Sequence, residues 1–260
     1  MKRRCFMAGM GMGALTLADA TGMTQAAYGA EIDGPKMWLS KSGHPSAKFP
    51  RVAIIGVGGA GCNLMVSMRI GGIFDGYGPR TELIAVDLCP FTLWYVGDAN
   101  ESAPERAPIK TIAIANFDSG RTVNAARAAA LRHHDQLTGI LNGADVVILV
   151  AGLGGGAGSA VTPIMAAWSR AAGARTVALA ITPFDFGGSS RQSDNALNSL
   201  RSNADQVIHF SNQAVAVELG DGATLEEVFA IQQHRIATHL TSICLPPGHT
   251  SLAPGYGLVP

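Results

Sequence analysis

The chain has 260 residues, with 19 basic and 19 acidic side chains, 47% hydrophobic residues and 32 glycines. This composition supplies enough apolar material for a core and excludes an intrinsically disordered protein. A net charge of zero gives no general attraction to nucleic acid or to an anionic membrane surface, and no nucleic-acid partner is expected. The four cysteines stand far apart without a CxxC pair, a pattern that fits neither a zinc site nor a disulfide framework.

Residues 1–50 differ in character from the rest of the chain and are predicted to be an N-terminal extension. The basic residues Lys2–Arg4 precede the mildly apolar run Phe6–Leu17, an arrangement typical of an export signal, and the adjacent arginines resemble a twin-arginine signal. The run is too short and too rich in glycine to span a membrane, so no transmembrane segment is expected. A disordered extension is the alternative interpretation, and residues 31–50 are predicted to be a linker.

Residues 51–244 are predicted to form one nucleotide-binding domain, followed by a Pro- and Gly-rich tail at 245–260. Short apolar runs alternate with helix-like stretches, which predicts an α/β fold: a doubly wound, mostly parallel sheet with helices on both faces. Ligands of such folds lie beyond the carboxyl ends of the strands. The expected strands are 52–55, 83–86, 109–114, 146–150, 176–181 and 207–210, and the expected helices are 62–70, 122–141, 160–172, 190–202 and 224–243.

A first glycine cluster lies between an expected strand and an expected helix, at residues 56–63. Gly56, Gly58 and Gly61 satisfy the GxGxxG pattern, in which bare backbone lets N–H groups approach a pyrophosphate at a helix N-terminus. Asp87 closes the next strand, where such an acid would bind a ribose hydroxyl. Taken alone, the pattern is equally compatible with a tight turn.

A second glycine cluster, Gly152–Ala160, follows the most apolar strand and also opens a helix. Two such junctions at equivalent positions predict that a polyphosphate is held between them. No GxxxxGK[ST] motif is present, and Ser159 is interpreted as a helix-start hydroxyl because no GxSxG elbow surrounds it. The histidines of His133–Asp135 are assigned to a solvated helix face, and no metal site is predicted.

Four segments resemble, in order and spacing, the GTP-binding domain of the tubulin and FtsZ family. They read GVGGAGCN, ADVVILVAGLGGGAGSA, TPFDFGGSSR and TLEEVFAIQQHRI, and the resemblance extends over about residues 51–243. The stretch Gly154–Ala160 carries most of the weight, because it is similar to the family signature GGGTGTG. The resemblance implies a Rossmann-like domain that binds GTP or GDP, with Mg²⁺ carried by the nucleotide, and it implies self-association or an FtsZ-like filament partner.

The resemblance also implies which residues contact the nucleotide. Arg191 matches an arginine that contacts the nucleotide, and Asn212 matches an asparagine that lies near the ribose and base. Phe229 matches an aromatic residue whose ring packs on guanine, and Gln233 matches the residue that hydrogen-bonds to the guanine edge. Phe229 and Gln233 are four residues apart and therefore share one helix face. The phosphates would lie at Gly58, Gly59, Ala60, Gly61, Cys62 and Asn63 in the first junction and at Gly154, Gly155, Gly156, Ala157, Gly158 and Ser159 in the second.

Departures from the family pattern bear mainly on hydrolysis. Ala157 replaces the signature threonine, Gly187 stands where a glutamate is usual, and Gln233 offers an amide in place of a carboxylate. The third phosphate loop is recognised only by its position, Asn116–Arg121. No acidic residue follows Glu227, so the acidic loop that completes the active site of the next subunit in the family is not found, and no catalytic residue is assigned.

The leading hypothesis from the sequence is a degenerate, single-domain FtsZ-like protein that binds guanine nucleotide and modulates cell-division or cytoskeletal filaments. We expect little or no autonomous GTPase activity. An NAD-dependent oxidoreductase that uses GxGxxG and Asp87 is one alternative, and a relic that holds no nucleotide is another. The expected compartment is the cytoplasm, where GTP is present, with export through the N-terminal signal as the alternative.

Overall fold

The computed structural model describes residues 50–75, 77, 79–114, 122–188 and 190–244. The expected extension before residue 50 and the expected tail at 245–260 lie outside these residues, as does the third loop, Asn116–Arg121. Six parallel strands form one sheet in the order β3-β2-β1-β4-β5-β6. The strands are β1 (Val52–Val57), β2 (Thr81–Asp87), β3 (Ile109–Ala113), β4 (Val146–Gly152), β5 (Arg175–Thr182) and β6 (Gln206–Ser211).

The position of each strand in the sheet follows from its apolar pattern. Every residue of β1 is buried, and in β4 and β5 only the end residues Gly152 and Arg175 are partly exposed. Strands covered on both faces require such uninterrupted apolar runs. The edge strands β3 and β6 mix buried and exposed positions. The prediction of a doubly wound parallel sheet is confirmed.

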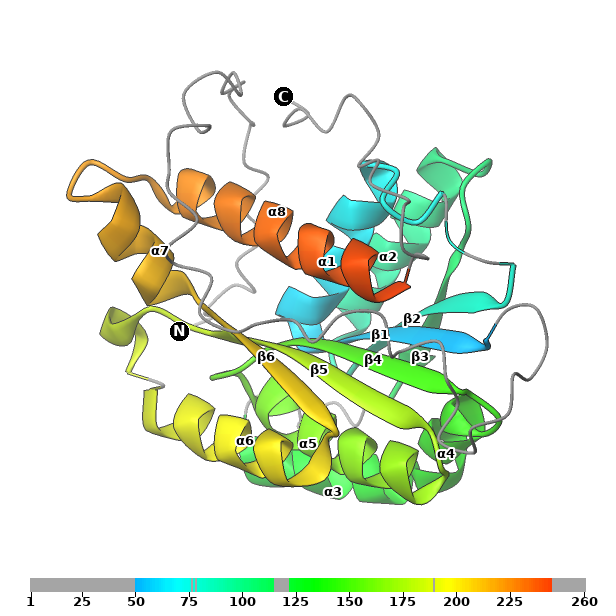
Figure 1. The fold of residues 1–260 in the computed structure, drawn as a ribbon. Coiled ribbons are helices and arrows are strands. Elements are labelled where there is room, and N and C mark those ends of the chain that lie inside the picture. Colours follow the sequence, from blue (N-terminus) through cyan, green and yellow to red (C-terminus); the bar gives the residue numbers. More distant parts are fainter. Residues whose placement is uncertain (1–49, 76, 78, 115–121, 189, 245–260) are drawn as a thin grey trace.

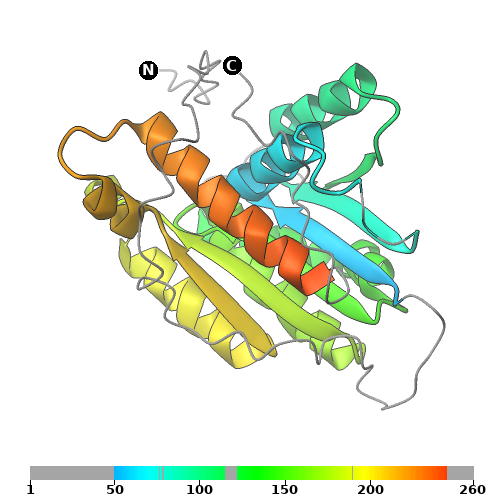
Figure 2. The same cartoon turned by 45° about the horizontal axis from the view of Figure 1, so that its top comes forward.

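Two layers of helices cover the sheet (Figure 1). The layer on one face consists of α1 (Gly58–Ile70), α2 (Pro90–Ser102) and α8 (Leu225–Cys244), and α8 lies across the sheet on the same side as α1 (Figure 2). The opposite face is covered by α3 (Val123–Arg132), α4 (His134–Leu141), α5 (Gly156–Ala171) and α6 (Ser190–Asn203). The short helices η4 (Asp185–Gly187) and α7 (Asn212–Leu219) follow the carboxyl ends of β5 and β6.

The structure differs from the expected helices in four respects. The helix expected from residue 62 begins at Gly58, so part of the first glycine cluster forms its first turn. The sequence did not reveal α2 and α7. The expected helix 122–141 is two helices, because His133 leaves the helical conformation at φ −101° and ψ 25°. The helix expected from residue 160 begins at Gly156, so most of the second glycine cluster forms its first turn.

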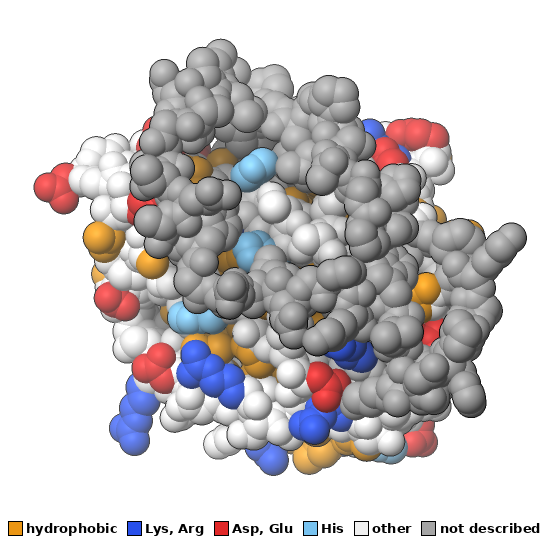
Figure 3. Space-filling model, in the orientation of Figure 1, with side chains coloured by type: hydrophobic (Ala, Val, Ile, Leu, Met, Phe, Trp, Pro, Cys, Tyr) orange, Lys and Arg blue, Asp and Glu red, His pale blue; other side chains and the backbone are white. Residues whose placement is uncertain are grey.

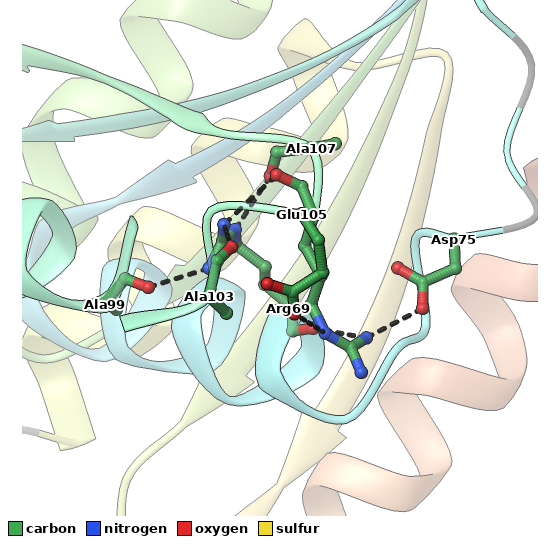
Figure 4. Close-up of polar contacts among 7 residues, drawn as sticks. Arg69, Asp75, Ala99, Ala103, Glu105 and Ala107 are labelled. Carbon is green, nitrogen blue, oxygen red and sulfur yellow. Dashed lines mark hydrogen bonds and ion pairs between the residues drawn. The ribbon is translucent and has the colours of Figure 1, made fainter. Parts of the chain in front are cut away.

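Arg69 joins α1 to the connection between α2 and β3 (Figure 4). Its side chain is 1% exposed, and its guanidinium donates to the carbonyl oxygens of Ala99, Ala103 and Ala107 at 2.8, 2.6 and 2.7 Å, and to that of Arg106 at 3.2 Å. Burial lowers the pKa of Arg69. The carbonyls near the end of α2 carry partial negative charge, and the nearby carboxylates of Glu105 and Asp75 also favour the charged form of Arg69.

Charged side chains of both signs are interspersed around the described part of the face seen in Figure 1 (Figure 3). This distribution agrees with the balanced composition, since neither sign dominates the visible surface.

Candidate nucleotide site

The site lies where the sheet reverses its winding, between β1 and β4. These central strands pair in parallel with Val57 opposite Ala151, and the helices that follow them, α1 and α5, cover opposite faces. Open α/β sheets bind ligands at this switch point, beyond the carboxyl ends of the strands. Both predicted glycine junctions are located here.

The two junctions touch each other at Gly58. A Cβ atom on this residue would lie 3.0 Å from the backbone nitrogen of Gly158 and 3.1 Å from the Cβ of Ala157, and its φ of +72° favours glycine. No side chain caps the N-terminus of α1 or of α5. Because no side chain among the described residues caps either helix, the first N–H groups of both are available to an anion with several oxygens.

Some glycines in these junctions are required for packing. A Cβ on Gly61 would overlap the carbonyl oxygen of Val150, and one on Gly158 would overlap that of Gly152. In turn, a Cβ on Gly152 would lie 2.6 Å from that of Ala60. Bare backbone at these positions lets each helix begin directly against the end of a strand.

Other residues of the junctions face open space. A Cβ on Gly155 would meet nothing within 4 Å, and one on Gly59 would meet only the Thr92 hydroxyl at 3.9 Å. Both glycines are exposed, as are Ala60 and Asn63. These positions can approach a ligand.

Two side chains form hydrogen bonds to the backbone of the second junction. The Ser159 hydroxyl accepts a hydrogen bond from the Gly154 N–H at 2.8 Å, and the Gln192 amide donates to the Gly154 carbonyl at 2.7 Å. Ser159 therefore has a local structural role, and the Gly154 N–H is already used. Sequence reasoning did not identify Gln192, which reaches the loop from α6.

Two polar groups beneath the first junction point inward. Cys62 is fully buried, and its thiol lies near the carbonyl oxygens of Gly56 and Val86, so its side chain cannot reach a ligand. Asp87 is 4% exposed, and its carboxylate accepts from the Leu88 N–H at 2.7 Å. Burial raises the pKa of both groups, and hydrogen bonds from Thr92, Leu88 and Cys89 partly oppose the rise in the pKa of Asp87. The burial of this carboxylate weighs against the ribose contact required by the oxidoreductase alternative.

The residues expected at the base gather where β5 and β6 end. Phe184, Val215 and Val228 pack together and bring the start of α8 to this edge of the sheet. Phe229 is 46% exposed, and its ring meets that of Phe184 edge to face at 5.9 Å between centroids. Phe186 stacks on Phe184 at 5.1 Å.

Asn212 lies on α7 and Gln233 on α8, the two helices of this region. Asn212 is 9% exposed at the start of α7, and its side-chain oxygen accepts from the Gln232 amide at 3.3 Å. Gln233 is partly exposed one residue further along α8. Gln232 and the two rings of Phe184 and Phe186 were missed by the sequence reasoning, although all three lie within the quoted segments.

Arg191 lies in the first turn of α6 and is exposed. It lines a groove of about 790 Å³ between α3, α5 and α6, which Ser159 also borders. The structure thus places Arg191 on the α6 side of the second junction.

Among the described residues, no three His, Cys, Asp or Glu side chains gather into a potential metal site. His134 instead pairs with Asp135 at 2.9 Å and packs edge to face on Trp168. Within the same residues, no helix is both long and apolar enough to cross a membrane.

Comparison with known proteins agrees with this geometry. The sequence profile described as "Tubulin/FtsZ family, GTPase domain" matches residues 51–218. Cell division protein FtsZ of Haemophilus influenzae is 28% identical over 193 residues, which cover 69% of this chain and 45% of that protein. FtsZ of Mycoplasmopsis pulmonis is 36% identical over 118 residues, covering 43% of this chain and 30% of that protein. The chain thus spans less than half the length of these curated relatives.

Solved structures establish the fold independently. CetZ from Methanosaeta thermophila superposes with a TM-score of 0.63 at 16% identity, covering 79% of this chain and 57% of that one. An empty FtsZ dimer from M. jannaschii gives a TM-score of 0.59 at 21% identity, covering 74% of this chain and 53% of that one. With the profile match over more than half of its residues, the chain belongs to the tubulin/FtsZ family, in the region of its GTPase domain.

Proposed function

We propose that this chain binds GTP and GDP, with the phosphates held between the N-termini of α1 and α5. The close approach of Gly58 to Ala157 and Gly158 carries the proposal, because it brings two uncapped helix starts together. Backbone N–H groups and two helix dipoles favour an anion there.

The base is proposed to lie against Phe229, with its polar edge toward Gln233 and its ribose near Asn212. A half-exposed ring supplies stacking area, and the amide of Gln233 can both donate and accept. The contact from Gln232 orients the Asn212 amide. Any Mg²⁺ would arrive coordinated by the nucleotide phosphates.

Competition binding with the full chain tests this proposal. A fluorescent GTP analogue should bind, and unlabelled GTP and GDP should displace it at much lower concentration than ATP or NAD. Equal displacement by all four nucleotides would refute guanine specificity. Displacement by NAD alone, lost in Asp87→Ala, would favour the oxidoreductase.

Hydrolysis by the single chain is proposed to be negligible. Ala157 provides no hydroxyl beside the terminal phosphate, and no catalytic base is assigned among the proposed contact residues. Phosphate release should stay at the rate of spontaneous GTP hydrolysis. A clear rate that Gly156→Trp abolishes would contradict this expectation and show that another group acts as the base.

We place this activity in the cytoplasm, in association with family filaments. The homology to cell division proteins supports this setting. Co-sedimentation of the full chain with a GTP-assembled FtsZ polymer should detect the association, and recovery of the chain only in the unsedimented fraction would argue against it.

A further inference from the structure

The outward side of α2 carries three large aromatic side chains. Phe91 is 66% exposed, Trp94 62% and Tyr95 38%. Spacings of three and four residues place them on one side of the helix. Soluble proteins rarely leave a contiguous aromatic surface exposed unless something binds it.

The same stripe continues into acidic residues. Asp98 and Glu101 are exposed one and two turns further along α2, and neither carboxylate has a hydrogen-bond or ion-pair partner among the described residues. The helix contains no basic residue. We call Phe91, Trp94, Tyr95, Asp98 and Glu101 the α2 face: its first half is aromatic and its second half is negative. This charge opposes binding to an anionic membrane.

The chemistry of the α2 face requires an occupant that is both apolar and basic. Residues 2–17 of this chain begin with Lys-Arg-Arg, continue through Phe6 and Met7 to further methionines, and contain no acidic residue. Methionine sulfur atoms pack favourably against aromatic rings. We propose that the α2 face is the docking surface for residues 2–17 of the same chain.

The dimensions fit an antiparallel arrangement. Glu101 and Phe91 are ten helical residues apart, about 15 Å, which an extended segment covers in about five residues. With Arg3 and Arg4 against the carboxylates, Phe6 and Met7 reach the rings. The covalent connection raises the effective concentration of the segment, which offsets the entropy lost when a glycine-rich chain is ordered.

The docked segment would lie next to the first glycine junction. Thr92, on the same first turn of α2, hydrogen-bonds Asp87 and lies 3.9 Å from the position of a Cβ on Gly59. Docking would also withhold the signal-like residues from an export receptor. The proposal does not depend on nucleotide binding, so it can fail or succeed separately from the proposed function.

Native cysteines allow a test in the full chain. Cys5 belongs to the segment, and Cys89 is the partly exposed N-cap residue of α2. Cys62 and Cys244 are buried, and burial raises the pKa of both thiols, so they react slowly. In the docked arrangement Cys5 lies near Tyr95, which is six helical residues, or about 9 Å, from Cys89. A bismaleimide of about that length should therefore join Cys5 to Cys89 within one chain. Digestion and mass spectrometry identify the product, and the Cys5→Ser variant is the control that should give no such cross-link.

Charge reversal decides whether the proposed contact produces the cross-link. Asp98→Lys with Glu101→Lys should lower the yield several-fold, as should Arg3→Glu with Arg4→Glu, and combining both pairs should restore it. Trp94→Ala should also lower it. These α2 side chains are exposed, so circular dichroism should show an unchanged fold. A yield that neither reversal changes, or a product found only between two chains, would overturn the proposal.

Discussion

The two ends of the proposed nucleotide site are built from different parts of the chain. The phosphate end is backbone: the first turns of α1 and α5, held against strand ends by Gly61 and Gly158. The base end is made of side chains, with Phe229 half-exposed and Asn212 oriented by Gln232. Substitutions of the packing glycines at the phosphate end should therefore affect folding as much as binding, whereas those at the base end should mainly change affinity and specificity.

The largest expected effect is at a packing glycine of the phosphate end. In Gly158→Ala the new methyl group would overlap the Gly152 carbonyl, which should lower the free energy of unfolding by about 2–3 kcal/mol. The matched control is Gly155→Ala, whose methyl group meets nothing within 4 Å and should change the free energy by less than about 1 kcal/mol. Urea unfolding measures both, and equal losses would show that the two classes of glycine do not differ.

The N-cap of α5 allows binding to be separated from folding. Gly155 has φ −87°, an ordinary value, so Gly155→Asp can cap the helix and should raise stability by roughly a few tenths of a kcal/mol. The carboxylate should also repel phosphate and weaken GTP binding at least about tenfold, or 1.4 kcal/mol.

Gly155→Asn is the control for this prediction, because it caps the helix without a charge. Its affinity should fall less than that of the aspartate variant. Thermal unfolding and GTP titration together provide the answer: tight binding by Gly155→Asp would place the phosphates elsewhere.

At the base end, loss of a ring should change affinity more than stability. Phe229→Ala should weaken GTP and GDP equally, by about 1–3 kcal/mol, because both share the guanine base. The free energy of unfolding should change by less, since the ring is 46% exposed. Phe229→Tyr retains the stacking area and should bind nearly normally. If Phe229→Ala bound GTP with wild-type affinity, this ring would not contact the nucleotide.

The smallest effect concerns Asp87, which lies below the phosphate end without contributing to it. Its folded pKa is raised by burial, so its ionisation costs more in the folded state than in the unfolded state. As pH rises from about 4 to 7, wild type should therefore lose stability relative to Asp87→Asn. Urea unfolding at both pH values measures this difference, and a difference that is independent of pH would contradict the shift.

The strands and the two glycine junctions were the most predictable parts of the molecule. All six strands coincide with the expected apolar runs, because burial on both faces leaves a continuous signal. Both glycine junctions were located from glycines between a strand and a helix. The contact of Gly58 with Gly158 was not derivable residue by residue, since it depends on the placement of two strands that are distant in sequence.

Other features were hidden for physical reasons. The helix α2 starts at a proline and exposes aromatic residues, so its pattern lacks the usual polar outer side. The break at His133 interrupts a stretch whose composition favours helix throughout. Gln192 and Gln232 act on atoms of other elements, and a single sequence contains no signal for such tertiary hydrogen bonds.

Binding of the phosphates at both glycine junctions can be followed residue by residue. Titration of the isotopically labelled full chain with GDP, followed by the backbone amide signals of Gly59 and Gly155, tests it most directly. If the two junctions form one phosphate site, both amides and their neighbours in the first turns of α1 and α5 should shift along a single binding curve. Shifts confined to one junction, or two curves with different dissociation constants, would contradict it.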